Sequence, residues 1–121
     1  MLSRSQIGSL GEEAATNYLR QNGFMICARN WRQGRYEIDI VAQKAGIIHF
    51  IEVKTRRAAS LLKPEETITT TKAAAMRRAA AAYLAQHPTT EEIEFDLIAV
   101  DMFPDGSYDI RYVSNVVEFG W

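Results

Sequence analysis

The chain has 121 residues, of which 47% are hydrophobic and 24% charged, and its formal net charge is −1. These values are typical of a globular protein and argue against a disordered or fibrous chain. The N-terminus has no apolar signal region, and no apolar run approaches the roughly 18–20 residues of a membrane span. We therefore expect one domain over residues 1–121, with a sizeable core, in the cytoplasm.

Charge is divided unevenly along the chain. Residues 1–90 hold 13 Lys and Arg against 7 Asp and Glu, whereas residues 91–121 hold 1 against 8. The basic part could bind phosphate groups, although an unevenly charged solvated surface is the alternative. The single cysteine, Cys27, excludes an internal disulfide, and its apolar neighbours predict a core residue. Neither His49 nor His87 has ligand spacing around it, so we expect a packed or capping histidine rather than a metal ligand.

Apolar residues at helical spacing predict a helix over residues 3–21, with Gly23 as its C-terminal stop. Glu12 lies midway along this helix, and its neighbours one turn away in either direction are all small. Another element could therefore approach this carboxylate closely. An exposed helix glutamate is the alternative.

A first strand over residues 24–30 and a basic turn over 31–35 lead into a predicted hairpin. Its alternating runs, 36–41 and 47–54, flank a turn centred on Ala45 and Gly46. In that register Lys44 pairs with Ile47, Asp39 with Glu52, and Glu37 with Lys54. Since side chains alternate along a strand, the four charged residues share one face, and the other face is apolar, with Ile38, Ile40, Ile51 and Val53.

This patch of three carboxylates and one ammonium predicts a cation site. Carboxylates opposed across a ladder repel each other, and an all-oxygen ligand set suits a hard divalent ion such as Mg²⁺. Lys54 would then orient or deprotonate a water molecule, or neutralise a phosphate. The alternative is that Lys54 is only an ion-pair partner of Glu37.

The remaining elements complete the order αβββαββ. A loop over residues 58–67 is placed to contact a ligand, and Thr69, Thr70 or Thr71 caps a second helix that ends near Gln86. Strands follow over 93–100 and 108–113, and an aromatic tail over 116–121 packs on the core or on a second subunit. We expect a mixed sheet flanked by helices.

Several segments appear in an order that is typical of one family. They include Gly11-Glu12-Glu13-Ala14-Ala15, Glu37-Ile38-Asp39-Ile40-Val41-Ala42, Ile51-Glu52-Val53-Lys54-Thr55-Arg56 and Phe95-Asp96-Leu97-Ile98-Ala99-Val100. Together they resemble the YraN-like family of bacterial proteins, over about residues 8–115. That family is similar to archaeal Holliday junction resolvases and belongs to the restriction-endonuclease-like superfamily, whose signature is Asp, a spacer, then Glu-x-Lys.

The resemblance implies a restriction-endonuclease-like α/β domain that hydrolyses phosphodiester bonds in DNA. Asp39 and Glu52 would bind Mg²⁺ or Mn²⁺, Lys54 would help to activate water, and Glu12 would complete the catalytic site. Lys72 would reach the site from the second helix. The residues expected to contact nucleic acid are Arg29, Arg32, Arg56, Arg57, Lys72, Arg77 and Arg78.

Two positions depart from the family pattern and concern substrate preference: Tyr36 replaces a usual glycine, and Thr70 a usual proline. Branched and single-stranded DNA both stay open as substrates, and DNA is expected over RNA. A homodimer also stays open, and no membrane partner is expected. One alternative is a nucleic-acid-binding module or scaffold that does not use its acidic site. Another makes the acidic C-terminal region and its aromatic tail a protein-interaction surface.

Overall fold

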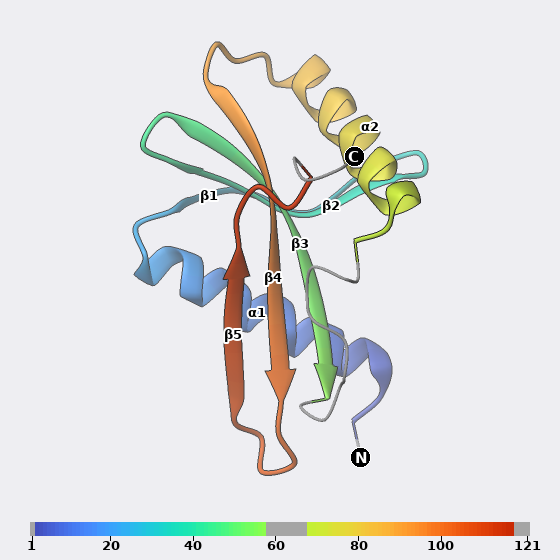
Figure 1. The fold of residues 1–121 in the computed structure, drawn as a ribbon, viewed down its shortest axis with the longest axis vertical. Helices are drawn as coiled ribbons and strands as arrows, with labels where there is room; N and C mark the ends of the chain where they lie inside the picture. Colours follow the sequence, from blue (N-terminus) through green and yellow to red (C-terminus); the bar gives the residue numbers. More distant parts are fainter. Residues whose placement is uncertain (1, 58–67, 118–121) are drawn as a thin grey trace.

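The computed structural model describes residues 2–57 and 68–117 (Figure 1). The elements are α1 (Arg4–Gln21), β1 (Met25–Gln33), β2 (Tyr36–Lys44), β3 (Ile47–Arg57), α2 (Thr70–Gln86), β4 (Glu92–Met102) and β5 (Tyr108–Val113). This order confirms the predicted α/β class and the arrangement αβββαββ. The expected ligand-contacting loop, 58–67, and the end of the aromatic tail, 118–121, lie outside the described residues.

The five strands form one mixed sheet in the order β1-β2-β3-β4-β5. Neighbouring strands are antiparallel except β3 and β4, which run parallel because α2 lies between them in the chain and returns the backbone to the starting edge. Figure 1 shows α1 running across one face of the sheet, with α2 beside β2. Neither α1 nor α2 has the length and apolarity needed to cross a membrane.

Local sequence signals set both helix starts and the central turn. Ser3 caps α1 and Thr69 caps α2, each accepting a hydrogen bond from a backbone N–H in the first turn. Ala45 and Gly46, with φ of 51° and 77°, form the two-residue turn between β2 and β3, and Lys44 pairs with Ile47 as predicted. The predicted register is confirmed as far as the pair Ile40 and Ile51.

The ladder between β2 and β3 ends at that pair, so the predicted backbone pairs of Asp39 with Glu52 and Glu37 with Lys54 are wrong. A continued ladder would offer the Val53 N–H to the backbone of β2. Here that N–H donates instead to Asp39 Oδ2, at 2.8 Å. Side-chain acceptance of this kind competes with sheet pairing.

Core packing separates the two faces of the sheet. Ala15 and Leu19 of α1 pack with Ile40 and Ile51 on one face, and α2 packs with Phe50 on the other. Val116 and Val117 of the tail are buried in a third cluster on β4, so the start of the tail packs on the core as one of the two predicted options.

Two predictions about buried side chains are wrong. Cys27 is exposed, because a bulge between Ile26 and Ala28 leaves it out of the pairing with β2. Ile38 packs with Phe50 on the α2 side and does not share the apolar face of Ile40. The pairing of β2 with β3 ends between these two residues, at Asp39.

Candidate active site

Asp39 and Glu52 come together although they are not paired in the ladder. Both line a cavity of about 20 Å³, together with Glu37 and Met76. Burial raises the pKa of Asp39 from 3.8 to about 7, and the charge of the Glu52 carboxyl adds to this shift. Two carboxyl groups this close cannot both ionise freely, so at neutral pH the pair retains part of a proton that a metal ion could replace.

Glu12 approaches this pair from α1 because the helix lies against β3 at a glycine. A Cβ atom on Gly11 would lie 1.7 Å from Thr55 Oγ1, so only glycine permits this contact. Burial raises the pKa of Glu12, and the charge of Asp39 raises it further. Within the described part of the chain, Glu12 Oε1 is buried with no hydrogen-bond partner. A bound cation would satisfy this oxygen.

The ammonium group that contacts the pair belongs to Lys72 on the first turn of α2. Lys72 Nζ lies 2.7 Å from Glu52 Oε2. Burial alone would lower the pKa of Lys72, but the hydrogen bond and charge of Glu52 outweigh it, and the pKa is raised. The structure therefore places Lys72 where the resemblance implied a residue reaching the site.

Lys54 does not line the cavity of Asp39 and Glu52. Its side chain is exposed, and it lines a groove of about 570 Å³ that also contains Glu12; we call this the α1 groove. No ion pair joins Lys54 to another described residue, and Glu37 instead lies 3.6 Å from Arg32. The described residues therefore do not form the ion pair between Lys54 and Glu37 that was the alternative.

Most of the arginines expected to contact nucleic acid are exposed: Arg29, Arg32, Arg57, Arg77 and Arg78. Ion pairs join Arg29 with Glu13 at 3.1 Å, Arg32 with Glu37 at 3.6 Å, and Arg56 with Asp101 at 2.7 Å. Arg56 is the least accessible of these three, with 11% of its side chain exposed.

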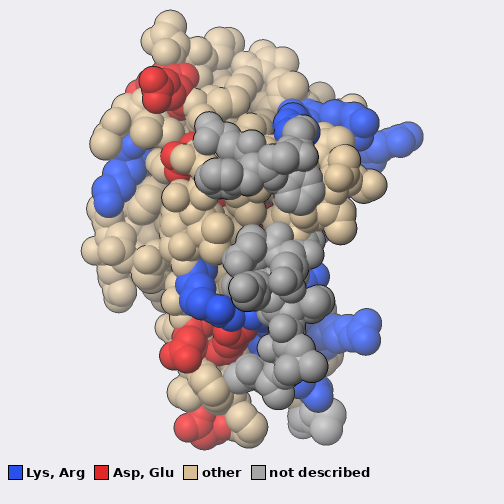
Figure 2. Space-filling model, viewed as in Figure 1, with Lys and Arg blue, Asp and Glu red and all other residues tan. Residues whose placement is uncertain are grey.

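Basic grooves adjoin the acidic cluster. A groove of about 650 Å³, which we call the α2 groove, is lined by Arg35, Lys72 and Arg78 and shares Glu37 and Met76 with the cavity at Asp39. The α1 groove adds Arg4, Lys54, Arg56 and Arg57 around Glu12. Figure 2 shows much of the visible basic surface on the side where α2 and the far end of β3 lie.

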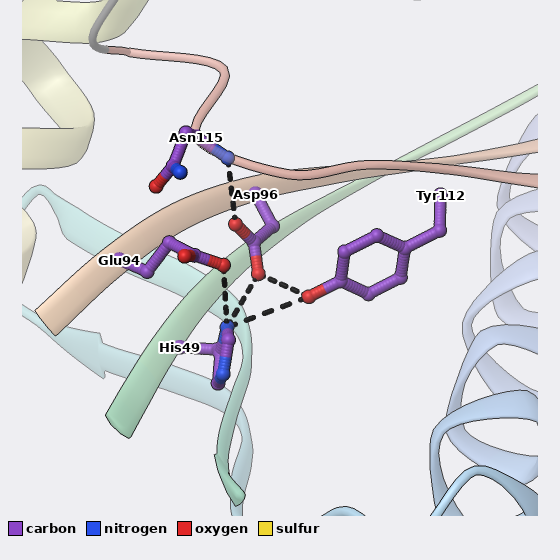
Figure 3. A network of polar contacts seen from close by, with 5 residues as sticks. All are labelled: His49, Glu94, Asp96, Tyr112 and Asn115. Atoms are coloured by element: carbon purple, nitrogen blue, oxygen red, sulfur yellow. Dashed lines mark hydrogen bonds and ion pairs between the residues drawn. The ribbon is translucent and has the colours of Figure 1, made fainter. Parts of the chain in front are cut away.

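A second polar cluster joins β3, β4 and β5 (Figure 3). His49 Nδ1 lies 2.6 Å from Asp96 Oδ2 and 3.1 Å from Glu94 Oε2. The Tyr112 hydroxyl donates to Asp96 Oδ2, and the Asn115 N–H donates to Asp96 Oδ1 at 3.0 Å. His49, Glu94 and Asp96 could hold a metal ion, since one ligand atom from each lies within 4.8 Å of the others.

Sequence reasoning missed this cluster because its members meet through the parallel pairing of β3 and β4, which places His49 beside Glu94. The signal that could have found it is the spacing of Glu94 and Asp96. Two carboxylates on one face of an otherwise apolar strand need a buried partner.

A model of the family described as uncharacterised protein family UPF0102 matches residues 11–100. The chain belongs to the UPF0102 family. The residues of this UPF0102 protein that the family model matches include Glu12, Asp39, Glu52 and Lys72.

Curated relatives cover nearly the whole of this UPF0102 protein. A UPF0102 protein of Bacteroides thetaiotaomicron is 36% identical over 115 residues, or 95% of this chain and 94% of that protein. One from Symbiobacterium thermophilum is 38% identical over 111 residues, covering 91% and 94%. One from Lawsonia intracellularis is 36% identical over 115 residues, covering 94% and 86%.

Proposed function

We propose that this UPF0102 protein is a metal-dependent nuclease of the restriction-endonuclease-like type, which hydrolyses phosphodiester bonds in DNA. One observation carries the proposal. Asp39 of β2 and Glu52 of β3 line one cavity beside the basic α2 groove, and the charge of Asp39 also acts on Glu12 of α1, which lines the basic α1 groove. Carboxylate clusters of this kind bind the metal ions that assist phosphoryl transfer.

The residues present fit a hard divalent ion. Asp39 and Glu52 offer oxygen ligands only, which favours Mg²⁺ or Mn²⁺ over softer metals. Glu12 Oε1 is buried without a partner among the described residues, and burial together with the charge of Glu52 raises the pKa of Asp39, which a cation would counteract. When bound, such an ion polarises the phosphate and lowers the pKa of a coordinated water molecule.

The side chains of the protein have separate roles in this proposal. Asp39 and Glu52 hold the ion, and the Val53 N–H fixes the orientation of the Asp39 carboxylate. Lys72 holds Glu52 in position through its ion pair. Lys54, exposed along the α1 groove, neutralises charge on a phosphate that lies beside Glu12.

The test is cleavage of labelled four-way junction, flap, single-stranded and duplex DNA in Mg²⁺, in Mn²⁺ and in EDTA. We expect cleavage of at least one substrate with metal. Asp39→Asn should reduce the rate at least about a hundredfold, because transition-state charge loses its stabilising ion. Asp109→Asn removes the same charge from an exposed position on β5 and should leave the rate unchanged.

Two outcomes would contradict the proposal. Cleavage that persists in Asp39→Asn would show that the reaction occurs elsewhere or comes from a contaminant. DNA binding without cleavage in either metal would instead favour the second candidate function, a non-catalytic DNA-binding module. The Lys72 ammonium favours that candidate, since it already compensates the charge of Glu52 in the place of a metal.

A further inference from the structure

We propose that His49, Glu94 and Asp96 form a second metal site, which takes a transition ion of the Zn²⁺ class and is distinct from the all-oxygen site at Asp39 and Glu52. His49 packs against Phe24 and lines a groove with Tyr18 of α1, so it faces the α1 side of the sheet. Glu52 has the same strand parity as Phe50, which faces α2. The two sites therefore lie on opposite faces of the sheet.

Backbone geometry brings the three ligands together. His49 and Glu94 are direct partners in the parallel ladder, and Asp96 is two residues further along β4, on the same face as Glu94. These strands are central in the sheet, with β2 and β5 outside them, which fixes the positions of the ligand side chains. Sites carried by strands hold their ligands more accurately than sites carried by loops.

The cluster places two carboxyl groups against one imidazole nitrogen. A neutral imidazole has one proton at most on Nδ1, yet this atom faces two carboxylates, at 2.6 and 3.1 Å. Asp96 is completely buried, and 17% of the Glu94 side chain is exposed, so both carboxyl groups are largely removed from water. Buried charges are normally paired or bound to metal, and one divalent ion would neutralise both.

The spacing suits a small ion. Bonds of about 2.0 Å in a tetrahedral site place neighbouring ligand atoms about 3.3 Å apart, so the closest pair in the cluster has to separate by less than about 1 Å. Contacts outside the ligand set already orient Asp96, which accepts from the Tyr112 hydroxyl and from the Asn115 N–H. Such outer contacts fix metal ligands in position.

Access and ligand chemistry define the class of ion. A groove of about 370 Å³ is lined by His49, Glu94, Tyr112 and Lys44, so an ion could reach the cluster from this side of the sheet. Imidazole with carboxylates suits Zn²⁺ or Co²⁺, whereas Mg²⁺ prefers oxygen ligands alone. The two sites should thus select different metals.

The experiment uses the full chain with Cys27→Ser, which removes an exposed thiol that would itself bind zinc. The protein is stripped with EDTA, saturated with Mg²⁺, and titrated with Zn²⁺ in a calorimeter. We expect one Zn²⁺ per chain, with affinity falling at least about tenfold in His49→Gln and in Glu94→Gln. His87→Gln and Glu92→Gln change the same residue types at the C-cap of α2 and at an exposed position of β4, and they should bind as the parent does.

A second readout covers variants that fold poorly. Zn²⁺ should raise the melting temperature of the parent and of Asp39→Asn, but not that of Glu94→Gln, which leaves the contact of His49 with Asp96 intact. The proposal is overturned if Zn²⁺ does not bind in the presence of Mg²⁺. It is equally overturned if Asp39→Asn abolishes binding, or if both His49→Gln and Glu94→Gln bind zinc as the parent does.

Discussion

At the scale of single residues, the state of Asp39 links metal binding to pH. Its pKa is about 7 in the metal-free protein because the carboxyl is buried beside Glu52. A metal ion has to displace this proton, so Mg²⁺ affinity should rise by up to about tenfold per pH unit below pH 7 and level off above it. Calorimetric titrations from about pH 5.5 to about pH 8.5 measure this slope.

Asp39→Asn provides the comparison for this titration. The amide has no proton to lose in this range, so residual Mg²⁺ binding should be weaker and should depend less on pH. An unchanged slope in the variant would mean that another group carries the pH dependence.

At the scale of elements, the contact of α1 with β3 positions Glu12. Gly11→Ala would place a methyl group 1.7 Å from Thr55 Oγ1, so the helix has to move outward and carry Glu12 away from Asp39. We expect a loss of about 1–3 kcal/mol of stability, which is typical of overpacking, together with reduced DNA cleavage. Chemical denaturation and the cleavage assay measure the two effects.

Gly8→Ala is the matched control for this prediction. It lies one turn earlier in α1, where an added Cβ atom meets nothing within 4 Å. Alanine favours the helix over glycine by up to about 1 kcal/mol, so this variant should be slightly more stable, and Glu12 should keep its position relative to Asp39. Equal behaviour of the two variants would show that the close contact at Thr55 does not matter.

The limits of sequence-based prediction also lie at this scale. The turn at Ala45 and Gly46 follows from residues close together in the chain and was predicted, and Thr69 was one of three predicted caps for α2. Two features were not, because they depend on contacts between distant segments. One is the Asp39 side chain that ends the ladder, and the other is the meeting of His49 with Glu94 across parallel strands.

In the candidate site, too, features set by nearby residues were predicted and features set by distant segments were not. Alternation along β2 and β3 placed Asp39 and Glu52 near each other, which the structure confirms through their shared cavity. The lysine nearest to them could not be assigned from the hairpin alone. Lys72 lies 20 residues after Glu52 in the chain. It reaches Glu52 because α2 packs on the face of the sheet that carries Phe50.

At the scale of the whole molecule, the uneven charge predicts salt-sensitive DNA binding. Arg35 and Arg78 line the α2 groove, and replacing both with Gln should weaken binding similarly for all sequences. The slope of log affinity against log salt concentration should become shallower by about 2, because two phosphate contacts are lost. Fluorescence anisotropy at several salt concentrations measures this slope.

Arg111→Gln serves as the control for charge alone. Arg111 lies on β5 and pairs with Asp101 at 3.1 Å, in the acidic part of the chain. Its loss should leave the salt slope unchanged. A slope that shifts equally in this variant would mean that DNA responds to net charge and not to the α2 groove.

The central strand β3 carries Glu52 on one face and His49 on the other, and the two residues between them, Phe50 and Ile51, are almost completely buried. Close packing lets the strand shift only as a unit, so a movement that opens His49 toward an ion also displaces Glu52. If both proposed ions bind, occupancy on one face should change affinity on the other, and thermodynamic reciprocity requires the effect to be equal in both directions. Zinc concentration would then tune the proposed magnesium-dependent cleavage across the thickness of one sheet.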